Sequence, residues 1–350
     1  MITAVHDPLA SVRAEFGSAD GYLAACTVGL PMDATRHAVA ADLAGRPDIA
    51  SYSRAVEQSR AHFASLVGVA PERVAIGSQT SVQVALLAAA LPAGSTVLVP
   101  EHEFSSLVLP FVHAGRGIRV RTAPLSRLAD AITSSTTLVA FSLVQSACGH
   151  VADVDAICTA AAAVGARTVC DATQAVGWMP VDAGRFDALL CHAYKWLCCP
   201  RGVAFMSVSA DYARTLAPVQ AGWYAGDDPW TSCYGGDADL AACARRFDVS
   251  PAWQAFVGAE PALRTFAQAD IAAVHAHATG LASRLRRALE LEQPDIPTAI
   301  VTWVDPGGDD LARLQAAGIT ASGRNGRARV AFHVFNDETD VDRAVAALRG

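Results

Sequence analysis

Short apolar runs alternate with helix-like segments along most of the chain. Seven runs have the length and composition of buried strands, at 74–76, 96–100, 118–122, 137–143, 167–170, 187–190 and 203–208. The alanine-rich segment 152–164 between two of them predicts a helix. This alternation predicts an α/β domain with a largely parallel sheet. Ligands of such sheets bind at the carboxyl ends of strands, so polar residues that follow strands are the candidates for function.

The pattern changes after about residue 255. A long helix is expected over 260–290, and shorter elements follow it: a strand at 296–303, a helix at 309–316, a strand at 327–335 and a helix at 338–349. These elements predict a second, smaller α+β domain. We therefore expect an N-terminal segment and large domain over 1–255 and a small domain over 256–350.

Composition narrows the possible partners. With 52% hydrophobic and 17% charged residues, the 350-residue chain is not intrinsically disordered. A net charge of -7 gives no attraction to phosphate backbones or anionic membranes, so we expect no nucleic-acid or membrane partner but a small-molecule one. Neither a secretory signal nor a membrane span is apparent, which predicts a cytoplasmic protein. Nine cysteines without a CxxC pair indicate reduced thiols and no structural metal.

Lys195 is the single lysine among 27 Lys and Arg residues. It lies in CHAYKWLCCPRG, after the predicted strand at 187–190. A lysine that captures a carbonyl carbon as a Schiff base must be partly desolvated, and a strand-end turn supplies such a position. The alternative is a surface lysine that happens to be unique.

Asp171 begins DATQAVG directly after the predicted strand at 167–170. A carboxylate at a strand end can form an ion pair with a protonated pyridine nitrogen and keep that ring electron-accepting. Gln174 could reach the phenolic oxygen of the same ring. The alternative for Asp171 is an ordinary helix N-cap.

A third signal is the polar turn Ser78-Gln79-Thr80-Ser81, which follows the strand at 74–76 and precedes a helix-like segment. Free backbone N–H groups at a helix start, joined by hydroxyls, form a site for one phosphate group. Simple capping of the helix would need only one of these residues. The chain contains neither GxxxxGK[ST] nor GxGxxG, so no P-loop or dinucleotide fingerprint competes for this role.

A phosphate turn, an aspartate and a lysine in this order meet the needs of pyridoxal 5'-phosphate. With these motifs the sequence resembles the class V aminotransferase group of fold-type I pyridoxal-phosphate enzymes. That group includes cysteine desulfurases, selenocysteine lyases, kynureninases, isopenicillin-N epimerase-like proteins and C–S lyases. The resemblance implies the fold-type I architecture and covers nearly the whole chain.

The resemblance also implies roles for individual residues. Lys195 in AYKWLCCPRG matches the imine lysine, and Asp171 and Gln174 in DATQ match the Asp-x-x-Gln pair. The other matching positions are Gln79 and Thr80 in the phosphate turn, His192 as a phosphate donor, Phe104 stacked on the pyridine ring, Gln145 or Ser146 near the ring oxygen, and Arg329 for the substrate carboxylate. Ser250 matches a loop that reaches the phosphate of a neighbouring subunit, which implies a homodimer.

The family performs several reactions, and one departure from its pattern bears on the choice among them. Residues 305–329 contain no cysteine, whereas cysteine desulfurases carry their nucleophile in the corresponding loop. We therefore expect no persulfide transfer. The resemblance alone implies a β-eliminating C–S lyase that acts on an amino acid, with an aminotransferase or an amino-acid epimerase as the alternative. A catalytically silent binding or assembly homologue is disfavoured because Lys195 and Asp171 are both present. The aromatic segment 222–230 is a candidate dimer contact, and the alternative is an ordinary surface loop.

Overall fold

The larger sheet of the computed structural model has strand order β1-β7-β6-β5-β4-β2-β3 within the described residues, 7–17 and 19–350. From β3 through β2, β4 and β5 to β6 all neighbours are parallel, and β7 is antiparallel to both β6 and β1. Because β1 and β6 are both antiparallel to β7, β1 runs in the same direction as β6. The predicted α/β class and mostly parallel sheet are confirmed.

The strands lie close to the predicted ranges. They are β1 (Val74–Gly77), β2 (Thr96–Pro100), β3 (Arg119–Ala123), β4 (Leu138–Ser142), β5 (Arg167–Asp171), β6 (Ala188–His192), β7 (Ala204–Val208), β8 (Ile300–Val304), β9 (Ser322–Arg324) and β10 (Arg327–Ala331). The helices are α1 (Ala10–Arg13), α2 (Asp33–Ala44), α3 (Ile49–Leu66), α4 (Thr80–Ala90), α5 (Ser105–Val112), α6 (Val154–Val164), α7 (Ala210–Ala213), α8 (Trp253–Gln268), α9 (Ile271–Ala288), α10 (Asp309–Ala316) and α11 (Glu338–Arg349).

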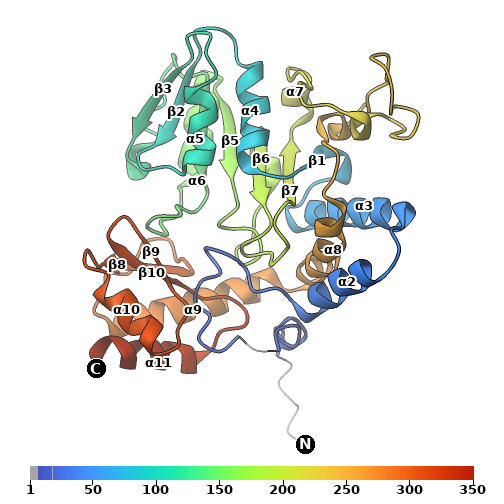
Figure 1. Ribbon diagram of the computed structural model, residues 1–350. Coiled ribbons are helices and arrows are strands. Elements are labelled where there is room, and N and C mark those ends of the chain that lie inside the picture. The colour runs from blue at the N-terminus through green and yellow to red at the C-terminus, as the bar shows by residue number, and fades with distance from the viewer. Residues whose placement is uncertain (1–6, 18) are drawn as a thin grey trace, which may run out of the picture.

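Helices cover both faces of the larger sheet, which explains why its strands read as continuous apolar runs. Alternate residues of each strand join different cores, since successive side chains point to opposite faces. In β2, for example, Leu98 belongs to one core and Val97 and Val99 to the other. The second core includes apolar residues of α4 and α5, and both helices lie over the sheet in Figure 1.

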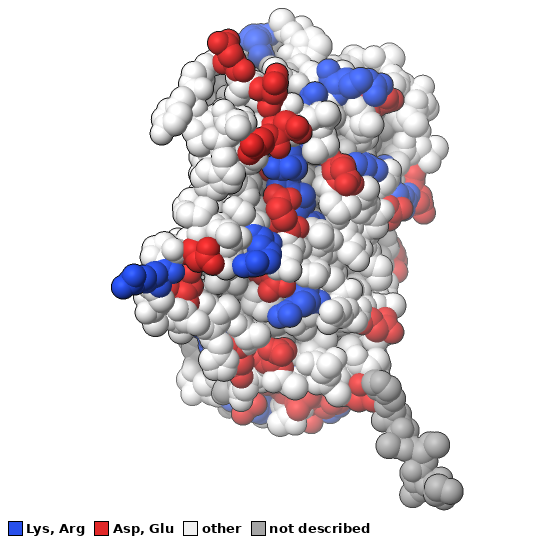
Figure 2. Space-filling model, turned by 90° about the vertical axis from the view of Figure 1, so that its right-hand side faces the viewer, with Lys and Arg blue, Asp and Glu red and all other residues white. Residues whose placement is uncertain are grey.

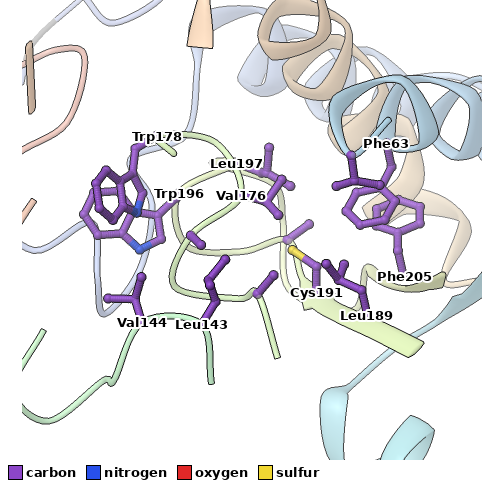
Figure 3. Packing of buried hydrophobic residues seen from close by; sticks show 14 of the residues in the cluster. Phe63, Leu143, Val144, Val176, Trp178, Leu189, Cys191, Trp196, Leu197 and Phe205 are labelled. Carbon is purple, nitrogen blue, oxygen red and sulfur yellow. The ribbon is translucent and has the colours of Figure 1, made fainter. Parts of the chain in front are cut away.

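The first core contains most of the large aromatic side chains. Phe63 of α3 stacks on Phe205 of β7 with ring centroids 4.4 Å apart, and Trp178 lies against Trp196 at 5.4 Å. Figure 3 shows these two aromatic pairs in one continuous cluster, with Leu189 and Cys191 of β6 between them. The turn that carries Lys195 is therefore anchored in the core by the next residue, Trp196, which is 1% exposed.

A separate antiparallel sheet, β8-β10-β9, packs with α9, α10 and α11 and lies below the larger sheet in Figure 1. This agrees with the α+β pattern expected after residue 255. The division into domains at residues 255 and 256 remains a prediction. The helix α8 crosses that position and packs against α2 and α3.

Several predicted boundaries in this part are wrong. The helix expected over 260–290 is two helices, because the Asp270 carboxylate accepts a hydrogen bond from Ala273 N at 3.0 Å and starts α9 anew. The strand expected over 296–303 begins at Ile300, after Pro294 and Pro297, and the strand expected over 327–335 ends at Ala331. The short strand β9 was not predicted.

The surface carries charges of both signs. Figure 2 shows acidic and basic side chains interspersed over one face, without a broad basic field there. None of the described helices is both long and apolar enough to cross a bilayer. All nine cysteines are free.

Candidate active site

Three parallel strands and β1 end at the same edge of the larger sheet, and a cavity lies there. Ser142, Asp171 and His192 are the last residues of β4, β5 and β6. The cavity is lined by Gln79, Thr80, Ser81, Phe104, Ser106, Ser142, Ser146, Asp171, Thr173, Gln174, His192, Tyr194, Lys195 and Arg201. The structure thus brings together nine of the residues singled out in the sequence, where ligands of such sheets bind.

Lys195 lies in the turn after β6, and its side chain is only 6% exposed. Its Nζ is 5.4 Å from the centroid of the Phe104 ring and 5.7 Å from that of Tyr194. Burial lowers the pKa of this amine to about 8, although the Asp171 carboxylate acts in the opposite direction. Gly29 packs so closely on the turn that a Cβ there would lie 2.0 Å from the Lys195 carbonyl oxygen, so a side chain at Gly29 would displace the lysine.

Asp171 is the final residue of β5 rather than the residue after it. Its Oδ1 accepts a hydrogen bond from Thr173 N at 2.9 Å, and burial raises the pKa of the carboxyl group. Hydrogen bonds from Thr173 and the charge of Lys195 oppose that shift. A buried carboxylate of this kind would gain from a cationic partner in the cavity.

Gln174 lines the cavity, and its amide is also engaged by the protein. Trp196 Nε1 donates to its Oε1 at 2.8 Å, and its Nε2 donates to Cys26 O at 2.9 Å and to Ser146 Oγ at 3.2 Å. The indole N–H can only donate, which fixes the orientation of the amide. The predicted contact with a ring oxygen remains a prediction.

The start of α4 forms the corner expected to bind phosphate. Gln79 is the N-cap residue, and Thr80 and Ser81 are the first two helical residues, so unpaired backbone N–H groups lie here. His192 Nε2 is buried without a hydrogen-bond partner among the described residues. Burial lowers the pKa of His192 to about 4, and Arg201 and Lys195 act in the same direction. Ser78 is half-buried and does not line the cavity.

Of the two residues expected near the ring oxygen, Gln145 and Ser146, only Ser146 lines the cavity. Gln145 Nε2 donates to Glu103 Oε2 at 2.7 Å, and Gln145 does not line the cavity. Ser146 does line it. Ser250 is exposed and lies outside the cavity of its own chain.

Arg329 is 0% exposed and does not itself line the cavity, but it contacts Ser146, which does. Its Nη1 donates to the Ser146 carbonyl oxygen and, at 3.1 Å, to Ser146 Oγ. Its Nη2 donates to Thr27 Oγ1 at 2.8 Å, and its Nε donates to Ser322 Oγ at 3.1 Å. Three chain segments therefore hold the guanidinium in one orientation.

The sequence analysis missed several cavity residues. Ser142 is the last residue of β4, Thr173 lies two residues after β5, and Ser106 is the second residue of α5. These small polar residues carry no motif of their own in the sequence. Tyr194 and Arg201 flank Lys195 in the motif AYKWLCCPRG, where proximity to the lysine was the available signal.

These donors and acceptors fit pyridoxal 5'-phosphate. Lys195 would supply an amine for its aldehyde, Asp171 an anion for its ring nitrogen, and the buried Nε2 of His192 and the start of α4 would supply donors for its phosphate. Among the described residues, no group of three or more His, Cys, Asp or Glu side chains could hold a metal ion.

Comparison with known proteins agrees with this chemistry. Residues 47–298 match the family model for aminotransferase class-V. The chain is 25% identical over 331 residues to isopenicillin N epimerase of Streptomyces clavuligerus, covering 83% of each chain. It is 30% identical over 323 residues to kynureninase of Deinococcus radiodurans, covering 85% of this chain and 78% of the relative.

A solved structure shows the same fold. A cysteine desulfurase from Escherichia coli superimposes with a TM-score of 0.84 at 19% identity, covering 99% of this chain and 98% of that one. The matching family model spans more than half of the 350 residues, and the fold agrees with it. The chain therefore belongs to the aminotransferase class-V family and is an enzyme that depends on pyridoxal 5'-phosphate.

Proposed function

We propose that the enzyme is a β-eliminating C–S lyase whose substrate is an amino acid with a sulfur substituent on its β-carbon. One substrate and one water would give a thiol, a 2-oxo acid and ammonium. The observation that carries this proposal is the single buried amine, Lys195, with a pKa of about 8, in a cavity whose facing aromatic residue is Phe104. Such an amine is a suitable base for the α-proton near neutral pH.

Each charged residue has a task in this reaction. The bound cofactor supplies an electron sink for the carbanion formed at the α-carbon. Lys195 removes the α-proton, and Asp171 keeps the ring nitrogen protonated. The carbon–sulfur bond then breaks and the sulfur leaves with the bonding electrons. A free cysteine thiol has a pKa of about 8.5, so a thiolate of this kind leaves without a dedicated acid.

Ser146 and Arg329 would bind the substrate carboxylate. The Ser146 hydroxyl oxygen accepts from Gln174 Nε2 and from Arg329 Nη1, two groups that can only donate in this arrangement. A serine hydroxyl has two acceptor positions and one hydrogen, so the hydrogen remains for an acceptor in the cavity. A carboxylate beside the buried Arg329 is such an acceptor.

The site offers little support for the alternative reactions. Epimerisation by two bases needs a second proton carrier on the opposite side of the α-carbon, and Phe104 has no titratable group. Transfer of a persulfide needs a nucleophilic cysteine, which residues 305–329 lack. Transamination uses the same lysine, so only product analysis distinguishes it from elimination.

The test is incubation of the holoenzyme with S-alkylcysteines and cystine. We expect thiol or persulfide and 2-oxo acid in equal amounts, with no requirement for an added 2-oxo acid. The Lys195→Ala variant should form neither product. Conversion that requires an added 2-oxo acid acceptor, or inversion of the α-carbon without loss of sulfur, would refute the lyase proposal.

We also propose that the enzyme is a homodimer in which Ser250 lies near the phosphate bound by the partner subunit. Ser250 is exposed, and the neighbouring loop presents Trp230 and Tyr234, of which Tyr234 is 94% exposed. The ring of Trp223 packs against that of Trp230 with centroids 5.1 Å apart, and this contact holds Trp230 in place at the surface. Light scattering should give twice the mass of the chain, and a monomer that keeps its cofactor and activity would contradict this arrangement.

A further inference from the structure

The corner of the cavity at the start of α4 lacks a permanent charge of its own. Gln79, Thr80 and Ser81 are neutral, and His192, with a pKa of about 4, is uncharged at neutral pH. The amide groups at a helix start carry roughly half a positive charge. A phosphate monoester carries between about one and a half and two negative charges near neutral pH, so these groups leave most of that charge uncompensated.

Arg201 lines the same cavity and supplies a full positive charge. Its guanidinium forms no hydrogen bond or ion pair with any of the described residues, so all five N–H donors are free for a ligand. After burial, the positive charge of Arg201 is the largest cause of the low pKa of His192. The charge of Arg201 therefore acts directly on this corner.

Tyr194 holds this arginine in place. The guanidinium carbon of Arg201 lies 4.4 Å from the centroid of the Tyr194 ring, within the range of a cation–π contact. The same ring packs edge-on against His192, with centroids 4.4 Å apart. The charge is therefore oriented by a side chain that also contacts the buried histidine.

We propose that Arg201, stacked on Tyr194, binds the phosphate group of the cofactor and provides the cationic charge that the rest of this corner lacks. The guanidinium can donate two parallel N–H groups to phosphate oxygens, which an ammonium group cannot do with the same geometry. Arg201 is thus a cofactor-anchoring residue and takes no part in the proton transfer, so this inference does not depend on which reaction the enzyme performs.

The experiment compares two aldehydes that differ only in the phosphate. The full-length protein is freed of cofactor and titrated with pyridoxal 5'-phosphate and with pyridoxal, and binding is followed by absorbance. In Arg201→Gln the dissociation constant for pyridoxal 5'-phosphate should rise about 10- to 100-fold, as expected for the loss of hydrogen bonds to a charged group. The constant for pyridoxal should stay at the wild-type value.

Two further variants and one control complete the test. Arg201→Lys keeps the charge without the planar fork and should lie between wild type and Arg201→Gln. Tyr194→Phe should bind like wild type, whereas Tyr194→Ala should lose part of the affinity for pyridoxal 5'-phosphate. The matched control is Arg121→Gln, since Arg121 is an exposed arginine of β3 outside the cavity.

Inorganic phosphate gives an independent readout. It should compete with pyridoxal 5'-phosphate for the wild-type protein and compete more weakly in Arg201→Gln. Equal losses of affinity for both aldehydes would indicate a structural role only and overturn the proposal. Wild-type affinity of Arg201→Gln for pyridoxal 5'-phosphate would overturn it as well.

Discussion

Replacement of the single lysine should stabilise the cofactor-free protein. Lys195 is buried, and its amine is charged at neutral pH although burial lowers its pKa to about 8 from an ordinary value of 10.5. The folded state therefore binds this proton less tightly than the unfolded state does. Lys195→Met removes the charge and keeps an unbranched side chain of similar length, so the unfavourable burial disappears.

The two pKa values set the magnitude and the pH range. Each pKa unit corresponds to about 1.4 kcal/mol, so a shift of about 2.5 units destabilises the folded state by about 3 kcal/mol. Below pH 8 both states carry the proton, and the full amount applies. Between pH 8 and about 10.5 the unfolded state binds more protons, so the stability of the wild type rises with pH. Above that range the difference from Lys195→Met should vanish.

Urea denaturation of the cofactor-free wild type and of Lys195→Met, measured from pH 7 to 10.5, tests this reasoning. We expect the variant to be more stable by 1 to about 3 kcal/mol at pH 7, the lower value allowing for lost contacts with Phe104 and Tyr194. No other lysine titrates in this range, because the chain has none. A difference that is independent of pH, or a less stable variant at pH 7, would refute the account of Lys195.

Three other outcomes are expected. Borohydride reduction of the holoenzyme should remove its visible absorbance and leave one modified peptide, containing Lys195; a modified peptide from elsewhere would contradict the assignment. Asp171→Asn should keep the fold and slow exchange of the substrate α-hydrogen severely, measured by NMR in heavy water; exchange at the wild-type rate would show that Asp171 does not hold the ring nitrogen protonated. Ser146→Ala should raise KM by about 10-fold with a smaller change in kcat, because it removes a hydrogen bond to the substrate carboxylate and one acceptor for Arg329; an unchanged KM would remove Ser146 from substrate binding.

The larger sheet could be predicted from the sequence because its strands are buried on both faces. A strand of that kind is a short apolar run whatever its neighbours are, as 96–100 illustrates, where the predicted and observed ranges coincide. The break between α8 and α9 could not be predicted in this way. The apolar pattern continues through it, α8 ends at Gln268, and one N-cap residue, Asp270, starts α9 without any change in composition. The strand β9 is three residues long and exists only through its pairing with β10.

Some residues of the site could likewise be identified from the sequence, whereas others could be identified only from the tertiary structure. Lys195 could be identified because the chain uses arginine everywhere else, and Asp171 because it interrupts an apolar context at a strand end. Composition does not single out Arg201, since arginine is common in this sequence, and only its proximity to Lys195 marks it. The proposed role of Arg201 comes from its place in the cavity without a hydrogen-bond or ion-pair partner among the described residues. Only the folded chain places the guanidinium of Arg201 beside uncharged hydrogen-bond donors that could bind a phosphate group. The fold brings together the start of α4 and the turn after β6, which are more than a hundred residues apart in the chain. Functional residues of this kind are therefore sought among the charged side chains that line a cavity and have no ion-pair partner within the chain.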